Sequence, residues 1–312
     1  MRDAVVVVGS GLMGTGIAAV SSLAGNRTLL FNRVMDKAKN GRESALKQCR
    51  ELRDNGLTTP DAEKRAEELI SATSDLEGAL PSARWVIEAI VENLEAKQDL
   101  FARLDGLLPP DVPILSNTSG LRITDIAAGM KHPERAVTAH FWFPAHLVPL
   151  VEVVVGDKSS IDVAVAVKEE LFRWGKAPVL VKRDMPGQLA NRILQAVIRE
   201  AVNIVEMGLA SAEDVDRAVK MGMGIRFPAW GPLEHIDAVG LDLCTSVQDT
   251  VLPGISARSD AAPLMRGLVS EGNLGYKTGK GVYDWSVKDM KALERRRNEF
   301  IIHALKKIGG LS

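Results

Sequence analysis

The N-terminal stretch Ala4-Val-Val-Val-Val8, Gly9-Ser-Gly-Leu-Met-Gly14, Thr15-Gly-Ile-Ala-Ala-Val20 sets the architecture of this chain. An apolar strand runs directly into a GxGxxG turn, and the turn opens a helix of small residues. This order predicts a cradle for the pyrophosphate of a dinucleotide, because glycines permit a tight turn and close approach while free amides at the helix start attract the anion. The residues that we expect to contact the cofactor or to shape this cradle are Gly9, Gly11, Leu12, Met13 and Gly14.

The segments that follow extend this start into an α/β fold. A second strand over 28–31 completes a βαβ unit, which requires parallel pairing. Residues 36–70 have the pattern of two charged helices broken at Asn55-Gly56, which we interpret as a helical hairpin inserted into the nucleotide fold. Later strands alternate with helices near 95–107 and 121–130, so we expect a Rossmann-type, mostly parallel, doubly wound sheet. The further strands that we expect are 85–88, 114–116, 137–139 and 151–155.

The pattern of the chain changes at Lys182-Arg-Asp-Met-Pro-Gly187. Residues 188–251 have helical periodicity with few strand-like segments, so we predict a dinucleotide-binding domain over 1–184 and an all-α substrate and dimerisation domain over 185–312. An apolar stripe along one long helix favours a homodimer through this second half, the alternative being that the stripe packs within its own domain. The stripe consists of Leu189, Ile193, Val197, Ile198, Ala201, Val205 and Leu209.

Composition indicates an ordinary globular protein. The 312 residues are 46% hydrophobic and 25% charged, and this length allows two domains. A net charge of −1 gives no broad attraction for nucleic acid or an anionic membrane, and no apolar run reaches the roughly 18 residues of a bilayer span. Cys49 and Cys244 lie far apart without a metal-ligand spacing. We therefore expect free thiols, no metal site, no nucleic-acid or membrane partner and a cytoplasmic location.

Two residues on neighbouring predicted strands suit the oxidation of an alcohol. That reaction needs a base for the hydroxyl proton while hydride leaves the same carbon, and imidazole titrates near neutral pH. His140 ends an apolar strand and Glu152 lies on the next strand, so a carboxylate behind the imidazole is expected to fix its tautomer. The spacing alone also fits a structural histidine and an unrelated glutamate.

Two further polar residues suit binding of the reacting oxygen. Ser119 follows a predicted strand, and Asn191 lies in the first turns of a predicted helix. Hydrogen bonds from such side chains strengthen as charge develops on the oxygen. Both positions also suit ordinary caps of a strand or helix. For His146, a second histidine close to His140, we expect no catalytic part.

Seven motifs follow one another along nearly the whole chain: 9–18; 87–93 with Lys97; Ser116-Asn-Thr-Ser119; His140-Phe-Trp-Phe-Pro144 with Glu152; Asp184-Met-Pro-Gly187 with Asn191-Arg192; Gly231-Pro-Leu-Glu234 through Val239-Gly-Leu-Asp242; and Lys277-Thr-Gly-Lys-Gly281. In this order they resemble the 3-hydroxyacyl-CoA dehydrogenase family, which includes the λ-crystallin-type hydroxyacid dehydrogenases. The resemblance implies a nicotinamide cofactor, a helical dimerisation domain and a catalytic pair of His140 and Glu152. It also implies that Ser119 and Asn191 line the active site, and that Glu92, Lys97, Ser119 and Lys277 lie near the cofactor.

The end of the second strand departs from the pattern typical of NAD binding. An acid normally hydrogen-bonds the ribose hydroxyls about 20 residues past the glycines, whereas Asn32-Arg33 stands here. A neutral side chain beside an arginine is able to accept a 2′-phosphate, which an acid would repel. We therefore favour NADP, or the use of both cofactors, over strict NAD. The alternative is that Asn32 binds the ribose of NAD and Arg33 points to solvent.

The substrate is expected to carry a hydroxyl group, and its class stays open. Phe143 replaces the asparagine of the family motif, and Gln188 stands where phenylalanine follows the Pro-Gly pair. Exchanges of single polar groups redirect specificity while leaving the chemistry intact. We expect a 3-hydroxyacyl-CoA such as 3-hydroxybutyryl-CoA, with a free hydroxy acid (gulonate- or carnitine-like) or an aromatic hydroxymethyl or aldehyde acid as alternatives. Arg226 suits either a free carboxylate or an interdomain ion pair, and a non-enzymatic, crystallin-like role is the alternative of another class.

Overall fold

The computed structural model describes residues 2–308. By its internal contacts the chain forms two compact units, Met1–Asn191 together with Asn298–Ser312, and Arg192–Arg297. The end of the last helix belongs to the first unit because Ile302 packs with Leu52 and Leu147. The predicted domain boundary between residues 184 and 185 lies just before the end of the first long segment, and it stays a prediction.

The first unit is built on a sheet whose strands are β1 (Ala4–Val8), β2 (Arg27–Phe31), β3 (Ile70–Thr73), β4 (Ala83–Glu88), β5 (Ile114–Ser116), β6 (Ala136–Phe141), β7 (Leu150–Val154) and β8 (Ala177–Val181). Within the described part of the chain they pair in the order β3-β2-β1-β4-β5-β6-β7-β8. The first six are parallel, whereas β7 runs antiparallel to β6 and β8 is parallel to β7. The predicted Rossmann-type, mostly parallel sheet is therefore confirmed.

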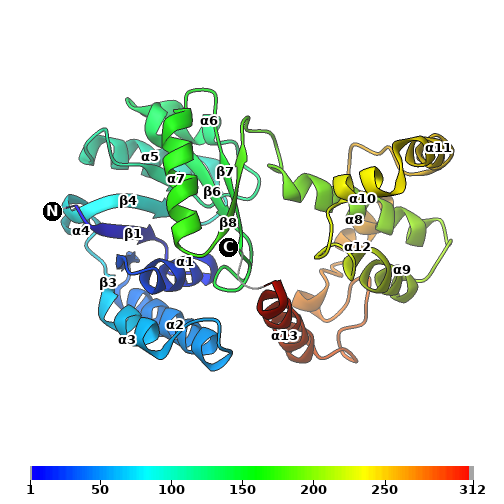
Figure 1. Ribbon diagram of the computed structural model, residues 1–312, viewed down its shortest axis with the longest axis horizontal. Helices are drawn as coiled ribbons and strands as arrows, with labels where there is room; N and C mark the ends of the chain where they lie inside the picture. The colour runs from blue at the N-terminus through cyan, green and yellow to red at the C-terminus, as the bar shows by residue number, and fades with distance from the viewer. Residues whose placement is uncertain (1, 309–312) are drawn as a thin grey trace. The chain divides into compact units, whose positions relative to one another are not determined.

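Helices cover both faces of this sheet, as the continuous apolar strands require. The helices of the first unit are α1 (Leu12–Leu23), α2 (Met35–Asp54), α3 (Pro60–Leu69), α4 (Leu76–Ala79), α5 (Leu94–Leu107), α6 (Ile123–Ile126) and α7 (Ile161–Arg173). One core contains residues of α1, α2, α3 and α7, and a second core on the opposite face contains residues of α4, α5 and α6. Figure 1 shows α7 lying across the near face of the sheet. All five residues of β1 are buried at the centre between these layers.

The helical hairpin that we predicted after β2 consists of α2 and α3. The break falls at Asn55 and Gly56, and Gly56 has a φ of 68°, in the left-handed region that glycine adopts readily. Thr59 caps the second helix by accepting a hydrogen bond from the amide of Ala62, and Pro60 occupies its first turn. Local turn and capping chemistry therefore fixes where the hairpin turns.

Some elements of the first unit have no counterpart in the sequence prediction, among them β3, α7 and β8. β3 is a short strand in which only Ile70 is buried, so it carries almost no alternating pattern. The helix α7 does carry a signal, because its buried residues Ala164, Val167 and Leu171 have helical spacing. In the segment 121–130, the α-helix covers only α6 and a 3₁₀ turn follows it.

The second unit contains most of α8 (Ala190–Glu206), then α9 (Ala212–Ala218), α10 (Pro232–Val239), α11 (Leu241–Val251), α12 (Pro263–Ser270) and the start of α13 (Met290–Ile308). The predicted helical C-terminal region is therefore confirmed. Of the residues 192–297, Ala262 alone is buried, so these helices form no core of their own. Over residues 2–308, no helix combines the length and apolar character needed to cross a bilayer.

Candidate active site

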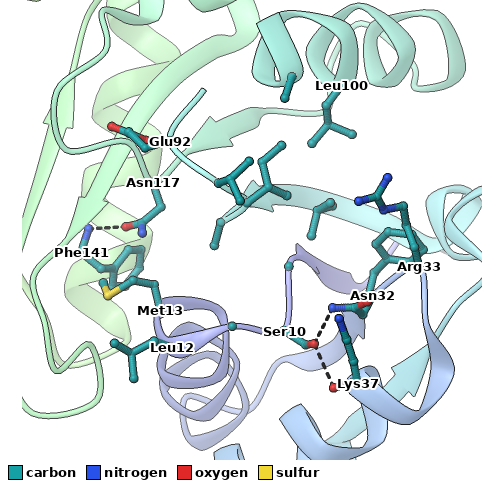
Figure 2. A pocket seen from close by; sticks show the side chains of 18 of the residues that line it. Ser10, Leu12, Met13, Asn32, Arg33, Lys37, Glu92, Leu100, Asn117 and Phe141 are labelled. Atoms are coloured by element: carbon teal, nitrogen blue, oxygen red, sulfur yellow. Dashed lines mark hydrogen bonds between the residues drawn. The ribbon is translucent and has the colours of Figure 1, made fainter. Parts of the chain in front are cut away.

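A cavity of about 1000 Å³ opens at the carboxyl ends of β1, β4, β5 and β6. Ligands of open α/β sheets bind at this edge, where the strand order reverses on either side of β1. Figure 2 shows the cavity with Leu12 and Met13 at one end and Asn32, Arg33 and Lys37 at the other. The predicted site residues that line it are Gly9, Gly11, Leu12, Met13, Asn32, Arg33, Glu92, Ser119 and His140.

The glycine turn has the close approaches that its motif predicts. Gly9 has a φ of 118°, and a Cβ there would lie 2.4 Å from the carbonyl oxygen of Ala89. A Cβ on Gly14 would lie 1.8 Å from the carbonyl oxygen of Gly9, so α1 packs against the turn only with glycine at this position. Around Gly11, by contrast, a Cβ would meet no atom within 4 Å. The turn is therefore tight where the protein packs and open where a pyrophosphate would approach, which fits a dinucleotide.

Polar and cationic groups surround the far end of this cavity, beside β2. The Asn32 Nδ2 donates to the hydroxyl of Ser10 at 2.9 Å, and that hydroxyl donates to the backbone carbonyl of Lys37 (Figure 2). The side chains of Arg33 and Lys37 line the same end of the cavity. Arg103 also lines it, and its guanidinium is paired with Glu77 at 2.7 Å. Neither Ser10, inside the glycine turn, nor Lys37, a few residues after Asn32-Arg33, was predicted as a site residue.

A buried ion pair underlies the loop after β4. The Lys97 ammonium lies 2.6 Å from Glu88 and 3.3 Å from Glu92, and both Lys97 and Glu88 are almost fully buried. Glu88 also accepts hydrogen bonds from the Ser116 hydroxyl and the Ile90 amide. Lys97 is therefore a support beneath the loop, and it is absent from the described residues that line the cavity.

Glu92 organises the loop that follows β5. Its Oε1 accepts hydrogen bonds from the Thr118 hydroxyl at 2.6 Å and from the amides of Ser119 and Gly120 at 3.1 Å. Burial opposes the charge of Glu92, but the Thr118 hydroxyl, Lys97 and the Gly120 amide outweigh it and lower the pKa of this carboxyl. An ionised Glu92 thus holds Ser119 at the cavity wall.

His140 and Glu152 meet across the antiparallel pair β6 and β7. The two residues are direct partners in the strand register, and Nδ1 of His140 lies 2.7 Å from Oε2 of Glu152. Both residues are buried, yet His140 lines the cavity that contains the glycine turn. Because Nδ1 faces the carboxylate, Nε2 is the ring nitrogen left for another partner.

The Glu152 carboxylate accepts hydrogen bonds on both oxygens. The indole N–H of Trp142 donates to Oε2 at 3.0 Å, while the amides of Leu189 and Ala190 donate to Oε1 at 2.9 and 2.8 Å. Burial disfavours the charge, but His140, the two amides and Trp142 together lower the pKa of Glu152 to about 2. The carboxylate behind His140 is therefore negatively charged at neutral pH.

The Asn191 side chain lies close to the backbone of Ser119, and their shared role in the active site stays a prediction. The Asn191 Nδ2 is 3.5 Å from the carbonyl oxygen of Ser119, and Gln188 donates to the carbonyl of Leu121. Gln188 has a φ of 53°, so the chain turns sharply after Gly187 before α8 begins. This turn aims the first amides of the helix at Glu152.

Other predicted residues lie elsewhere. His146 bonds Glu51 at 3.3 Å and lines a second cavity instead of the site cavity. Lys277 and Arg226 belong to the second compact unit, so their roles stay predictions. Asn117 was not predicted as a site residue; its Oδ1 accepts a hydrogen bond from the Phe141 amide at 2.8 Å (Figure 2).

Comparison with known proteins identifies the family of this chain. The family model "3-hydroxyacyl-CoA dehydrogenase, NAD binding domain" matches residues 4–185, and "3-hydroxyacyl-CoA dehydrogenase, C-terminal domain" matches 187–285. The chain belongs to the 3-hydroxyacyl-CoA dehydrogenase family. It is a nicotinamide-dependent dehydrogenase that acts on the CH–OH group of a small molecule, and its first domain is of the NAD-binding type.

Relatives of this dehydrogenase act on two kinds of substrate, according to their names. It is 33% identical over 94% of both chains to 5-formyl-3-hydroxy-2-methylpyridine 4-carboxylate 5-dehydrogenase of Mesorhizobium japonicum. It is 36% identical, over 91% of its length and 98% of the relative, to a probable 3-hydroxybutyryl-CoA dehydrogenase of Bacillus subtilis. Among solved structures, an NAD⁺-dependent dehydrogenase of the same pyridine carboxylate is 30% identical, with a TM-score of 0.92 over the whole of both chains. A 3-hydroxybutyryl-CoA dehydrogenase of Ralstonia eutropha is 31% identical over 91% and 99%, with a TM-score of 0.76.

Proposed function

We propose that this dehydrogenase oxidises a CH–OH group with His140 as the base that accepts the hydroxyl proton at Nε2. The observation that carries the proposal is the 2.7 Å contact of Nδ1 with Glu152, in a histidine that shares its cavity with the glycine turn. Glu152 fixes the tautomer and stabilises the imidazolium that forms. A nicotinamide held at the glycine turn supplies the chemistry of the hydride acceptor. In this proposal the hydroxyl proton passes to Nε2 of His140, and the hydride leaves the carbon that carries the hydroxyl group.

Ser119 and Asn191 are proposed to hydrogen-bond the reacting oxygen. Their proximity supports this role, since the Asn191 amide reaches the backbone of Ser119. Such hydrogen bonds stabilise charge on the oxygen as its proton leaves. Glu92 and Lys97 are proposed to act on the cofactor side through the loop that they hold, and Lys277 is proposed as a further cofactor contact.

For the substrate we propose first a 3-hydroxyacyl-CoA such as 3-hydroxybutyryl-CoA, supported by the family and by the relative from Bacillus subtilis. The second candidate is an aromatic hydroxymethyl or aldehyde carboxylic acid. Two observations favour this candidate: the whole-length similarity to a pyridine carboxylate dehydrogenase, and Phe143, which lines the cavity together with Phe141 and His140. Aromatic faces beside the base suit a planar substrate ring.

For the cofactor we propose use of NADP, alone or together with NAD. Arg33 and Lys37 line the cavity at the strand end where NAD-specific proteins carry an acid, and both are cations. The Asn32 side chain is held by Ser10 and by the Val34 amide, so it offers no negative charge there. A 2′-phosphate would form charge-assisted hydrogen bonds with the two cations.

The proposed base is tested by a His140→Gln variant assayed on a substrate panel. The panel holds 3-hydroxybutyryl-CoA, free 3-hydroxy acids and aromatic hydroxymethyl acids, each followed by the reduction of NAD and of NADP. Removal of the base is expected to lower kcat about 10²- to 10⁴-fold on the true substrate. The matched control is His146→Gln, which changes a histidine outside the site cavity and is expected to keep its kcat.

Two outcomes would contradict this proposal. Full activity of His140→Gln would remove His140 as the base, and an unreactive panel would shift weight to the crystallin-like alternative. The panel also separates its three substrate classes, because only one of them is expected to give saturation at low concentration.

We further propose a homodimer through the helices of residues 185–312, in a cytoplasmic protein. The near absence of buried residues over 192–297 supports the dimer, since apolar helices without a core need a covering surface. The free thiols of Cys49 and Cys244 agree with a reducing compartment.

A further inference from the structure

We propose that Trp142 is a positioning residue of the dyad, whose indole N–H shares Oε2 of Glu152 with His140 and thereby sets how strongly the carboxylate holds the protonated imidazole. The inference rests on the proposed function, in which His140 is the base. It assigns a task to a side chain that lies between the histidine and the proline of its motif, where neither the periodicity nor the resemblance gives it one.

The geometry around Glu152 carries this inference. A carboxylate offers about four acceptor sites, and here four donors occupy them: His140 and Trp142 on Oε2, and the amides of Leu189 and Ala190 on Oε1. The two backbone donors hold one oxygen in place whatever side chains stand there. The other oxygen is shared by a ring nitrogen at 2.7 Å and an indole nitrogen at 3.0 Å.

The hydrogen bond from Trp142 weakens the attraction between Glu152 and a protonated His140. Each N–H that donates to a carboxylate stabilises the negative charge on its oxygens, so less of that charge remains to attract a neighbouring cation. The indole N–H therefore moderates the pull of Oε2 on the imidazolium. Without it, Glu152 would hold the protonated base more tightly, and a base that stays protonated cannot accept the hydroxyl proton.

The elements that pack around the dyad also carry charged groups. Among the described residues, the carboxylates that line the cavity with His140 are Glu92, after β4, and Asp99, on α5, and Lys97 on α5 lies 3.3 Å from Glu92. Lys97 is paired in turn with Glu88 at the end of β4. On the other side of β7, the register partner of Glu152 is the apolar Val179 of β8. Trp142 is thus the side-chain donor that shares the dyad oxygen with His140.

The test is a Trp142→Phe variant, which keeps an aromatic ring and removes the N–H. We expect the acidic limb of the pH profile of kcat/KM to move to higher pH by about half a unit, with a plateau within about threefold of the wild type. Substitution by benzothienylalanine at position 142 keeps the two-ring shape without the N–H, and is expected to give the same displacement. An NMR titration of the His140 imidazole protons in the resting protein reads the same change without any turnover.

Trp174→Phe provides a matched control. Trp174 donates its indole N–H to Glu170 at 3.1 Å, so the control loses the same type of Trp–Glu hydrogen bond in the same unit, away from the dyad. Its pH profile is expected to coincide with that of the wild type.

Failure of the proposed function and failure of the role of Trp142 give different experimental results. If His140→Gln stays active, the proposed function is lost together with this inference. If His140→Gln is inactive but the acidic limb and the NMR titration of both position-142 variants match the wild type, His140 remains the base and the role of Trp142 is refuted. A change in plateau alone, without displacement of the limb, would show a purely structural role and would also refute it.

Discussion

Single side chains at the end of β2 are proposed to decide how the adenosine half of a cofactor is held. The cavity presents Arg33 and Lys37 there, together with an Asn32 amide that is already used by Ser10. An acid at this strand end would accept hydrogen bonds from ribose hydroxyls and repel a phosphate, whereas two cations attract a phosphate. Substitutions at these few positions are therefore expected to change the choice between NAD and NADP without changing the fold.

We predict that the double variant Arg33→Gln/Lys37→Gln loses about 10- to 100-fold in kcat/KM for NADP, as expected for one or more charge-assisted hydrogen bonds to a phosphate, and changes less than about threefold for NAD. Steady-state kinetics with each cofactor measure this. Arg103→Gln is the control, because Arg103 lines the same cavity but is paired with Glu77. Equal losses with both cofactors, or a wild type that uses NAD alone, would contradict the prediction.

At the scale of elements, the connection between β6 and β7 depends on a lysine that precedes β8. The Lys176 ammonium is buried and donates to the carbonyl oxygens of Ala145 and Val148, at 2.5 and 3.1 Å. Burial lowers the pKa of Lys176 to about 7. The connection that follows the dyad histidine is therefore held by a group whose charge is costly in the folded state.

This cost predicts how stability changes with pH. The pKa of Lys176 in the folded protein lies below its usual 10.5, so the unfolded chain binds more protons between about pH 7 and 10.5 and the free energy of unfolding rises with pH over this interval. Relative to a Lys176→Met variant, the wild type should gain about 2 kcal/mol between pH 7 and pH 9. Urea unfolding at the two pH values measures it.

Lys306→Met controls for the removal of a lysine from the same neighbourhood. Lys306 is exposed and lines the second cavity with Lys176, so its removal should leave the pH dependence of unfolding unchanged. If the wild type and Lys176→Met show parallel pH dependences, the ammonium is not destabilised by burial.

At the scale of the whole molecule, the second unit leaves large apolar side chains exposed. Leu243, Val247 and Val251 follow one another at helical spacing on α11 and are 55%, 51% and 49% exposed. Apolar stripes of this kind are expected to be covered by a symmetric contact between two copies of the chain.

We predict that the protein sediments as a dimer at micromolar concentration, and that Leu243→Glu/Val247→Glu shifts it toward the monomer, because burying two carboxylates in the contact is costly. Analytical ultracentrifugation measures both. Val165→Glu on α7 places a carboxylate at another partly exposed apolar position, in the first unit, and should leave the mass unchanged. A monomeric wild type would contradict the prediction.

Much of the site was predictable because its signals are local. The turn from Gly9 to Gly14 is one contiguous motif, and the close approach of Gly14 to Gly9 arises within it, whereas that of Gly9 to Ala89 depends on the chain just after β4. The hairpin of α2 and α3 follows from the turn at Gly56 and the cap at Thr59. In contrast, β3 and β8 carry weak patterns and depend on the strands beside them, β2 and β7, for their pairing.

By itself, the sequence determined the dinucleotide cradle and the alternation that builds the sheet, because both are written in short-range spacing and residue type. His140 and Glu152 were predicted as a pair through the resemblance of their motif, since their spacing alone left the pairing open. Only the tertiary structure decided that β7 runs antiparallel to β6, which puts Glu152 directly opposite His140. It also decided that Lys97 lies buried beneath the site and that Trp142 and the start of α8 converge on Glu152. These arrangements join segments up to tens of residues apart, and hydrogen bonds between such segments depend on how the sheet brings strand ends together, which no local pattern encodes.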